Sequence, residues 1–439
     1  MFMHLKTLVI SILAMTMASR VGAFTAQSQE PHQIAILNYG KIALAERIKL
    51  VESAQQRISL ESFSFDIGPS TRLLLQAILK KAKNGVKVEI TLDKFGTDRS
   101  ELSALQLFAK SNNIDLRVFN TSKDIGFRTH RKILIVDESR AIVGGRNLQD
   151  QQYENLKEVQ AIDREVLIEG PIVKDIQKSF DLVFNGKHTN RDYKNRKREE
   201  ELEKIKSWFV ETEADQSYKK KIQLMLSKDV PESRHAIRGI CQSITWSTST
   251  DKETFEDPQK TIYSRLSSAS SKVQIESPYF IPSKKQKKLL TELMDRNIEL
   301  EFLTNGALSS FEFHISLANY DAIKFQKKGL NVRFLDGTLP FNRREKEIEV
   351  WRLHAKTYIV DSEKFAITSF NWDRRSETIN LETALTCDES SDLVANLSDY
   401  MSRQFNGQGT TQDFFKNYSK SKALFFIERM VINPFKPLF

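Results

Sequence analysis

The chain has 439 residues, 40% of them hydrophobic, and its 66 lysines and arginines exceed its 57 aspartates and glutamates to give a net charge of +9. This length and composition exclude an intrinsically disordered chain and favour two or three globular domains. The modest basic excess suits an anionic partner, such as a phosphate-bearing lipid or a nucleic acid, without distinguishing the two.

Residues 1–23 are predicted to form a signal peptide. Lys6 precedes an apolar run from Thr7 to Ala18, and Val21-Gly22-Ala23 places small residues where signal peptidase requires them. The run is well short of the roughly 20 apolar residues that span a bilayer, so an uncleaved anchor is the weaker interpretation. We therefore expect an exported protein, periplasmic or secreted, that lies peripherally on a membrane.

A first lobe is predicted over residues 33–186, with helices and strands in alternation. Ser70 is expected to cap a helix that ends at Asn84-Gly85. The apolar periodicity also indicates a helix at 43–56 and strands at 58–65, 86–93 and 114–120.

Residues 187–235 are dense in charge and are predicted to form a helical connector, with a solvated helix over 194–204. The basic stretch from Lys194 to Arg198 also fits an arm that binds nucleic acid. Acidic residues follow it at once, so nucleic acid is the weaker partner for this chain.

A second lobe, residues 236–420, repeats the order of the first. Ser283 is expected to cap a helix that ends near Asn297, and the pattern indicates a helix at 259–270 and strands at 273–280, 298–305 and 330–336. This alternation predicts, in each half, a mainly parallel sheet covered by helices on both faces, an α/β fold. The loop at 339–350 is longer than its counterpart, and extra loop near a site often shapes substrate entry.

Two further features leave alternatives open. Cys241 and Cys387 stand one in each half, without a C-x-x-C motif or a Cys/His cluster at metal-ligating spacing. We interpret both as buried small hydrophobic residues, with a structural disulfide as the alternative. The apolar C-terminal tail, 421–439, fits either a segment packed on the second lobe or one that lies in a membrane interface.

The most informative feature is a duplicated motif. His130-Arg-Lys132-Ile-Leu-Ile-Val-Asp137 recurs as His354-Ala-Lys356-Thr-Tyr-Ile-Val-Asp361, so the pattern H-x-K-x4-D occurs in each half. Ten residues beyond each aspartate stands an asparagine, Asn147 and Asn371. The repetition of a whole constellation in matched settings argues against a pair of ordinary strand histidines.

The strand that follows each lysine fixes how these side chains are distributed. Successive side chains of a strand point to opposite faces, so the histidine and the lysine of a motif share a face. The aspartate, five residues beyond the lysine, falls on the other face. Although we include Asp137 and Asp361 in the catalytic motifs, this alternation favours structural carboxylates that bond backbone or basic groups.

The duplicated residues suit attack on a phosphodiester. One neutral imidazole can attack phosphorus to form a phosphohistidine while the other, protonated, donates to the leaving oxygen. Lys132 and Lys356, with the amides of Asn147 and Asn371, would hold the nonbridging oxygens. This chemistry requires no metal ion or other cofactor.

These residues resemble the phospholipase D superfamily, and the order of the chain from 45 to about 404 is most similar to bacterial cardiolipin synthases that lack a transmembrane hairpin. The resemblance implies two phospholipase D-like α/β/α lobes with pseudo-two-fold symmetry and one active site between them, so that a monomer suffices. The segment Asp163-Arg164-Glu165 resembles the one in which an acidic residue supports the first histidine.

The likeness continues in the second lobe. Ser369-Phe-Asn371-Trp-Asp373-Arg-Arg375-Ser376 resembles the family pattern G-S-x-N-x-D-x-R-S, which implies that Ser369 joins the asparagines at the substrate phosphate. Asn380-Leu-Glu382 resembles N-x-E, in which the glutamate orients the second histidine by fixing its tautomer. Thr368 stands where the family usually has glycine. His314 fits either a contact to the substrate headgroup or a capping, solvent-facing residue.

The leading hypothesis is a phosphatidyltransferase that acts on a phospholipid at a membrane surface and converts phosphatidylglycerol to cardiolipin. Water as the acceptor would make the same site a phospholipase D that produces phosphatidic acid. The family resemblance implies that His130 is the nucleophile, whereas the near symmetry of the motifs leaves that assignment open. The alternatives from other classes are a secreted metal-independent nuclease and a catalytically silent lipid-binding scaffold.

Overall fold

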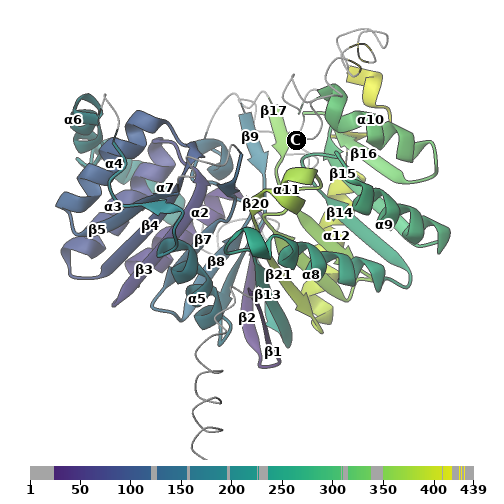
Figure 1. Cartoon of the computed structure of the whole chain (residues 1–439), viewed down its shortest axis with the longest axis horizontal. Helices are drawn as coiled ribbons and strands as arrows, with labels where there is room; N and C mark the ends of the chain where they lie inside the picture. The colour runs from purple at the N-terminus through teal and green to yellow at the C-terminus, as the bar shows by residue number, and fades with distance from the viewer. Residues whose placement is uncertain are drawn as a thin grey trace, which may run out of the picture.

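The structure is a computed structural model of the chain, and it describes residues 24–119, 126–155, 159–194, 198–224, 226, 236–307, 309, 315–337, 350–407, 409–417, 425, 427 and 430. Two lobes lie side by side, the first in purple and blue and the second in green and yellow (Figure 1). The predicted signal peptide, His314, most of the loop at 339–350 and most of the C-terminal tail lie outside these residues.

Each lobe is built on a sheet that has nine strands within the described residues. The first sheet has the spatial order β11 (Thr189–Asn190), β5 (Ile114–Phe119), β4 (Lys87–Gly96), β3 (Arg57–Ser64), β7 (Ile133–Val136), β8 (Arg140–Gly144), β10 (Glu165–Glu169), β2 (His32–Leu37) and β12 (Ile237–Cys241). The second has the order β1 (Phe24–Ser28), β13 (Ser243–Thr248), β21 (Thr383–Asp388), β19 (Lys364–Thr368), β18 (Thr357–Val360), β14 (Lys272–Glu276), β15 (Glu299–Asn305), β16 (Asn331–Leu335) and β22 (Thr410–Thr411).

Only part of each sheet is parallel. The runs β3–β4–β5 and β14–β15–β16 are parallel, whereas the motif strands β7 and β18 lie antiparallel to both of their neighbours. The prediction of mainly parallel sheets is therefore wrong for this part of each lobe. Each motif strand continues into the next through a turn, at 137–139 and 361–363, and so short a connection joins antiparallel strands only.

Helices cover both faces of the sheets and divide the protein into three main cores. The outer core of the first lobe packs under α2 (Gly40–Glu52), α3 (Pro69–Lys83) and α4 (Arg99–Ser111), and that of the second under α8 (Glu256–Ser267), α9 (Lys284–Asp295) and α10 (Ile315–Gln326). A third core, between the sheets, contains residues of α5 (Val173–Phe184) and α12 (Ser391–Phe405). Along β7, Leu134 and Val136 face the outer core, while Ile133 and Ile135 face the core between the lobes.

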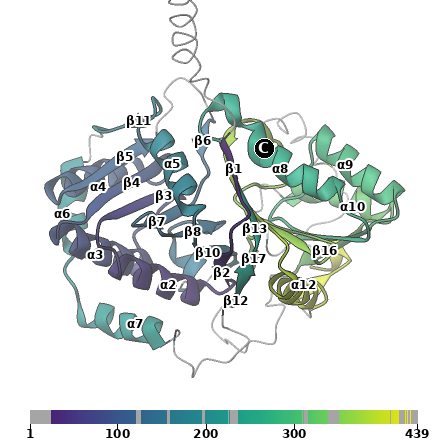
Figure 2. The same ribbon diagram turned by 90° about the horizontal axis from the view of Figure 1, so that it is seen from below.

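The lobes exchange their leading strands. β1 pairs with β13 in the second sheet, and β12 pairs with β2 in the first, so both pairs lie at the junction of the lobes (Figure 2). Residues 24–28 thus belong with the second lobe and residues 237–241 with the first, which differs from the predicted lobe boundaries at 33 and 236. Apolar periodicity identifies a strand but does not report the sheet in which that strand finds its partner.

The charged connector packs on the first lobe as α6 (Arg198–Trp208) and α7 (Glu213–Leu224). Ile205 and Ile222 are buried in the outer core of that lobe, and Arg72 of α3 forms an ion pair with Asp215. Within the described residues, the helix expected at 194–204 spans Arg198–Trp208, and it is less solvated than its charge indicates.

The two predicted helix caps differ in outcome. Ser283 is the N-cap of α9, where its Oγ accepts a hydrogen bond from the N–H of Gln286 at 3.1 Å. The N-cap of α3 is Gly68 instead of Ser70, because Pro69 occupies the first helical position, which suits its fixed φ. Ser70 lies in the first turn, and its N–H donates to Asp150 Oδ1 at 2.8 Å.

Cys241 and Cys387 form a disulfide with their Cα atoms 5.9 Å apart, so the interpretation of both as unpaired residues is wrong. Cys241 ends β12 in the first sheet, and the chain then enters β13, in which Ile244 lies opposite Cys387 of β21. The bond therefore joins the sheet of one lobe to the sheet of the other. Within the described part of the chain, no helix combines the length and apolar character that crossing a bilayer requires.

Reduction of this disulfide is expected to lower the free energy of unfolding by about 2–5 kcal/mol, because the bond restricts the unfolded chain across a separation of 146 residues. Urea unfolding with and without reductant measures the effect. The variant C241A/C387A is the control, since its stability should not respond to reductant. Equal stability of the oxidised and reduced wild-type protein would contradict the prediction.

Candidate active site

Two short parallel strand pairs join the lobes at the motif histidines. β6 (Arg128–Thr129) pairs with β20 (Asn380–Leu381), and β9 (Val159–Ile162) pairs with β17 (Val350–Leu353), a pair that Figure 1 shows between the lobes. The N–H of His130 donates to the Leu381 carbonyl at 2.8 Å, and the N–H of His354 donates to the Ile162 carbonyl at 2.7 Å. Each histidine is thereby fixed next to an acidic residue of the other lobe, because Glu382 follows Leu381 and Asp163 follows Ile162.

Each imidazole contacts the acidic side chain of the opposite lobe. Nδ1 of His130 lies 3.1 and 3.0 Å from the two carboxylate oxygens of Glu382, and Nδ1 of His354 lies 2.5 Å from Oδ2 of Asp163. The expected pairing of Asp163 with the first histidine and Glu382 with the second is therefore wrong. The pairs are crossed, because the backbone hydrogen bonds run between the lobes.

Asp163 is held from within the first lobe. Its Oδ1 accepts a hydrogen bond from the N–H of Arg164 at 2.7 Å, and the buried guanidinium of Arg146 donates to its backbone carbonyl at 2.5 Å. A Cβ at Gly145 would lie 2.2 Å from Asp163 Oδ1. Glycine at this position therefore lets the carboxylate approach the turn that follows β8.

Glu382 is held by hydroxyl and amide donors of the second lobe. It is buried and accepts hydrogen bonds from the Ser369 hydroxyl, from the Ser376 hydroxyl at 2.7 Å and from Asn380 Nδ2 at 3.3 Å. The Ser369 hydroxyl thus helps to position this carboxylate, and its contact with substrate phosphate stays a prediction. The N–H of Thr368, which stands where the family usually has glycine, donates to the Lys356 carbonyl at 3.1 Å.

The motif lysines are buried beside their own histidines. Lys132 Nζ donates to the carbonyl of His130 at 2.6 Å. Lys356 Nζ donates to the carbonyl of His354 and lies 3.1 Å from Nδ1 of that ring. Both side chains are 1% exposed, so each ammonium is withdrawn from water next to an imidazole, as the shared strand face predicts.

Two buried residues that the sequence analysis missed hold the strands that lead into the histidines. Asp93 Oδ2 accepts a hydrogen bond from the N–H of Thr129 at 2.9 Å. Asn305 Oδ1 accepts one from the N–H of Leu353 at 2.7 Å, and its Nδ2 donates to the Leu353 carbonyl at 2.8 Å. Both close the predicted strands 86–93 and 298–305. Their position could have indicated a role at the site, because functional residues of parallel sheets often lie at the carboxyl ends of the strands.

The two asparagines occupy matching positions three residues beyond β8 and β19. Asn147 Oδ1 accepts a hydrogen bond from the N–H of Ser64 at 3.3 Å, and the N–H of Asn371 donates to the Ser376 hydroxyl at 3.0 Å. Both side chains are buried, at 5% and 8% exposure. Asn147 is therefore held through its carboxamide, and Asn371 is held through its backbone N–H.

The motif aspartates lie away from the histidines, at the turns that follow β7 and β18. Asp137 accepts hydrogen bonds from the N–H groups of 55, 56 and 57 at 2.8 Å, and Asp361 accepts them from 270, 271 and 272 at 2.7–2.9 Å. Partial burial opposes ionisation of Asp361, but these donors outweigh it and hold its pKa well below the usual range. These contacts favour the structural role of Asp137 and Asp361, and their inclusion among the catalytic residues stays a prediction.

Burial lowers the pKa of both histidines. The pKa of His130 falls well below its usual value through burial and through the charges of Lys132, Lys356 and His354. The pKa of His354 falls to about 4 through burial and Lys356, although Asp163 opposes the shift. Each ring responds to charges from the other lobe, so the two motifs share one electrostatic environment.

The groups around the rings also have shifted pKa values. Burial raises the pKa of Glu382 to about 8, whereas the pKa of Asp163 is lowered because His354 and Lys356 outweigh its burial. Burial lowers the pKa of Lys132 to about 7 and that of Lys356 to about 8. A bound phosphate would raise the pKa of each of these cations, since an opposite charge favours the charged form.

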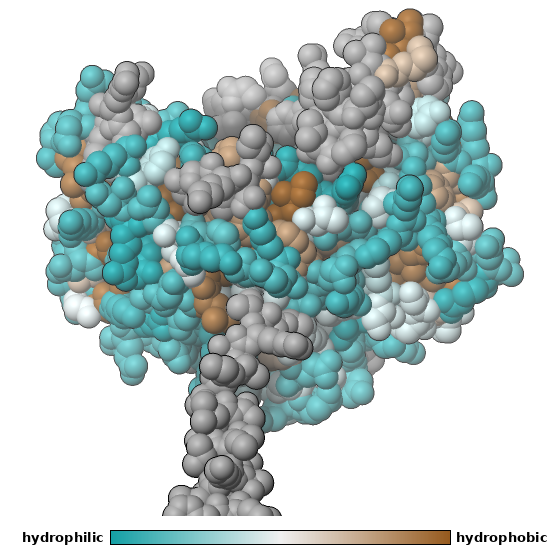
Figure 3. Space-filling model, in the orientation of Figure 1, coloured by the Kyte–Doolittle hydropathy of each residue, from teal (hydrophilic) through white to brown (hydrophobic). Residues whose placement is uncertain are grey.

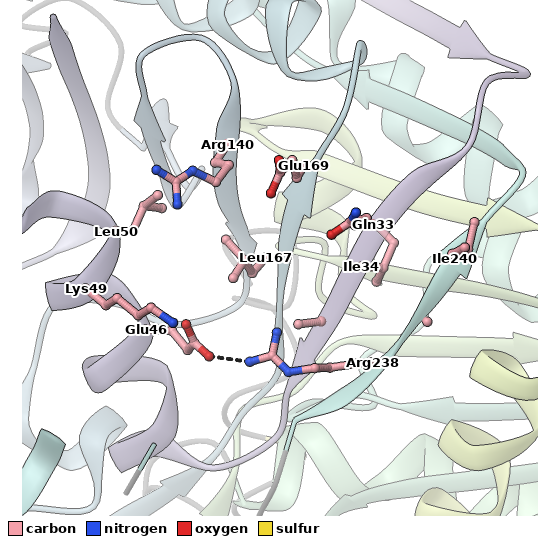
Figure 4. A pocket seen from close by; sticks show the side chains of 12 residues that line it. Gln33, Ile34, Glu46, Lys49, Leu50, Arg140, Leu167, Glu169, Arg238 and Ile240 are labelled. Carbon is pink, nitrogen blue, oxygen red and sulfur yellow. Dashed lines mark hydrogen bonds and ion pairs between the residues drawn. The ribbon is translucent and has the colours of Figure 1, made fainter. Parts of the chain in front are cut away.

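A cavity elsewhere in the first lobe has none of the motif residues in its lining. The cavity in Figure 4, of about 480 Å³, is lined by residues that include Glu46, Lys49, Leu167 and Arg238, and lies against β2, β10 and β12. The face in Figure 3 is mainly hydrophilic, with small hydrophobic groups and one of them near its centre. Among the residues that the structure describes, no three histidine, cysteine or acidic side chains gather as metal ligands would.

Comparison with known proteins identifies the class to which this fold and site belong. The family described as "Cardiolipin synthase, PLD-like domain" matches residues 48–184 and 262–406, which is more than half of the chain and includes both motifs. The chain belongs to this family. It is a phospholipase D-type enzyme of the phosphatidyltransferase class.

Particular relatives cover most of the chain. It is 26% identical over 415 residues to cardiolipin synthase C of Escherichia coli K12, covering 85% of each chain. It is 28% identical over 391 residues to an uncharacterized protein of Helicobacter pylori strain 26695, covering 82% of this chain and 77% of the relative. A solved phosphatidylserine synthase of Haemophilus influenzae Rd KW20 superposes with a TM-score of 0.66 at 13% identity, over 92% of this chain and 95% of that one, which shows a shared fold.

The substitutions D163N and E382Q are expected to lower kcat by roughly 10³- to 10⁴-fold, because the amide cannot hold the imidazole in the required tautomer. D361N should instead leave kcat almost unchanged and lower the free energy of unfolding by about 1–3 kcal/mol, since it disturbs only the turn. Hydrolysis of a chromogenic phosphodiester and urea unfolding measure the two effects. A D361N protein that is stable but inactive would restore the motif aspartates to the reacting centre.

Proposed function

We propose that the protein is a cardiolipin synthase-type phosphatidyltransferase that converts phosphatidylglycerol to cardiolipin through a phosphatidyl-histidine intermediate. The observation that carries the proposal is the pair of imidazoles, His130 and His354, each in contact through Nδ1 with a carboxylate of the other lobe. Because Nδ1 is occupied, Nε2 is the atom of each ring that remains for the substrate.

In the first step, Nε2 of one neutral histidine attacks the phosphorus of phosphatidylglycerol. A P–N bond forms while the P–O bond to the headgroup glycerol breaks. Nε2 of the other histidine, in its protonated form, gives its proton to the departing oxygen. Glycerol leaves, the lipid is bound as phosphatidyl-histidine, and the second histidine is neutral. The pKa of both rings is lowered in the protein without substrate. The negative charge of the bound phosphate raises the pKa of the second histidine and thereby favours its protonated form.

In the second step, a headgroup hydroxyl of another phosphatidylglycerol attacks the same phosphorus. The neutral histidine accepts the proton of that hydroxyl, a new P–O bond forms and the P–N bond breaks. Cardiolipin is released and both histidines return to their starting states. Water in place of the second lipid follows the same steps and gives phosphatidic acid, so the acceptor decides between transfer and hydrolysis.

The neighbouring side chains have assigned roles in this scheme. Lys132 and Lys356 bind the nonbridging oxygens and stabilise the charge that accumulates on them, together with the carboxamides of Asn147 and Asn371. Asp163 and Glu382 each accept from Nδ1 of a ring, which fixes the tautomer and stabilises the imidazolium. Each ring thus has a carboxylate at Nδ1, so the contacts alone do not distinguish the rings, and the family resemblance implies that His130 is the nucleophile. Mass mapping of the lipid adduct trapped in a His354→Asn protein tests that assignment.

The reaction is proposed to take place outside the cytoplasm, with the enzyme peripheral on a membrane. The Cys241–Cys387 disulfide supports this location, because disulfides persist mainly in oxidising compartments such as the periplasm. The net charge of +9 favours a surface of anionic headgroups.

Incubation of the purified protein with phosphatidylglycerol vesicles, followed by mass spectrometry of the lipids, tests the proposed function. We expect cardiolipin to form together with free glycerol, and both products to disappear in the His130→Ala and His354→Ala variants. Phosphatidic acid without cardiolipin would assign the protein as a phospholipase D hydrolase. Cleavage of a plasmid in EDTA, without turnover of lipid, would overturn the proposal in favour of a nuclease.

A further inference from the structure

An arginine is duplicated together with each motif. Arg128 stands two residues before His130, and Arg352 stands two residues before His354, so the repeated pattern extends to R-x-H-x-K. The chemistry described above uses the histidines and lysines and leaves these arginines without a role. Arg128 lies on β6 and Arg352 on β17, the strands that join the lobes.

Arg128 lies on the same side of its strand as the reacting residues of the first motif. Its guanidinium carbon is 5.8 Å from the centroid of the Phe63 ring. The imidazole of His130 lies 5.1 Å from that ring centroid, and Lys132 Nζ lies 5.4 Å from it. Arginine, histidine and lysine therefore gather around one phenylalanine, with the arginine toward the outside, where its guanidinium also lies 4.7 Å from Phe95, a residue that is 41% exposed.

The surroundings of Arg128 leave it donor capacity for an anion. Its Nε is buried and has no hydrogen-bond partner among the described residues. Burial and the charge of Arg375 of α11 (Arg374–Thr378) lower the pKa of Arg128, and the carboxylate of Asp93 opposes the shift. Arg375 Nη2 donates to the Gly126 carbonyl at 3.1 Å. Two guanidinium groups held near each other repel, and an anion between them relieves that repulsion. The equivalent Arg352 of the second lobe instead interacts with Tyr279.

We propose that Arg128, with Arg375 beside it, is a subsite that binds the phosphate of the acceptor phospholipid. This inference rests on the proposed function and deepens it, because it names the residue that selects a lipid over water as the acceptor. Guanidinium groups suit such a site, since they bind phosphate oxygens through two parallel N–H donors.

The spacing between the two sites fits the product. Residues two apart along a strand are separated by roughly 6.6 Å, which sets the distance from the backbone of Arg128 to that of His130. A glycerol bridge that joins two phosphates has a comparable length. Because the guanidinium of Arg128 and the imidazole of His130 both lie against the Phe63 ring, an acceptor whose phosphate is bound at Arg128 presents its free glycerol hydroxyl beside the histidines. Water carries no phosphate and gains nothing from this subsite.

The test compares two acceptors that share one donor. Wild-type and variant proteins are given phosphatidylglycerol vesicles with isotopically labelled glycerol in solution. Cardiolipin reports the acceptor that has a phosphate, and labelled phosphatidylglycerol reports the acceptor that lacks one. We expect R128Q to lower the ratio of cardiolipin to labelled phosphatidylglycerol by about tenfold or more, the effect of losing a charge-assisted hydrogen bond. R128K, which keeps the charge without the paired donors, should recover part of that ratio.

Two controls separate this inference from the proposed function. Arg403 forms an exposed ion pair with Asp399 on α12, far from the motifs in sequence, and R403Q should leave the product ratio unchanged. Failure of the wild-type protein to form either product would overturn the proposed function itself. A wild-type protein that forms both products, with an unchanged ratio in a folded R128Q protein or an equal loss of both products, would overturn the acceptor subsite alone.

Discussion

The active-site geometry depends on the backbone hydrogen bonds that tie each motif to the opposite lobe. The N–H of His130 bonds to the residue before Glu382, and the N–H of His354 bonds to the residue before Asp163. Because the acidic residue follows directly in the chain, the backbone contact places the carboxylate at Nδ1 of the histidine. Neither lobe holds a complete pair by itself, so the site exists only in the closed arrangement of both.

Several buried groups fix that arrangement. Arg164 of the first lobe forms an ion pair with Glu276 of the second and donates to Thr357 at 2.6 Å, and Arg131 reaches the Ser249 carbonyl of the second lobe at 3.3 Å. Buried charges of this kind add little net stability, but loss of one partner costs about 3–5 kcal/mol, so they oppose any other docking of the lobes. The disulfide and the exchanged strands β1 and β12 act in the same direction. These contacts hold the two motifs in one arrangement relative to each other.

Local sequence patterns predicted the parts of the structure that depend on neighbouring residues. The motif strands at 133–136 and 357–360, the shared face of histidine and lysine, and the backbone contacts of Asp137 all follow from alternation along one strand. The crossed pairs could not be predicted in this way, because Asp163 and Glu382 lie 191 and 252 residues from their histidines. The two lobes are also similar, so each histidine has an equivalent acidic residue in its own lobe. The exchanged strands and the disulfide were missed for the same reason, since a pattern of burial reports that a strand is covered and not what covers it.

The crossed pairing can be observed directly in the proton spectrum of the protein with ¹⁵N-labelled histidine, where a ring N–H that donates to a carboxylate gives a separate downfield signal. His130→Gln and His354→Gln assign the signals of the two rings. We predict that E382Q shifts or removes the signal of His130 and leaves that of His354 in place, and that D163N does the reverse. A change at His354 in E382Q, or at His130 in D163N, would show that each lobe supports its own histidine and would rule out the crossed pairing.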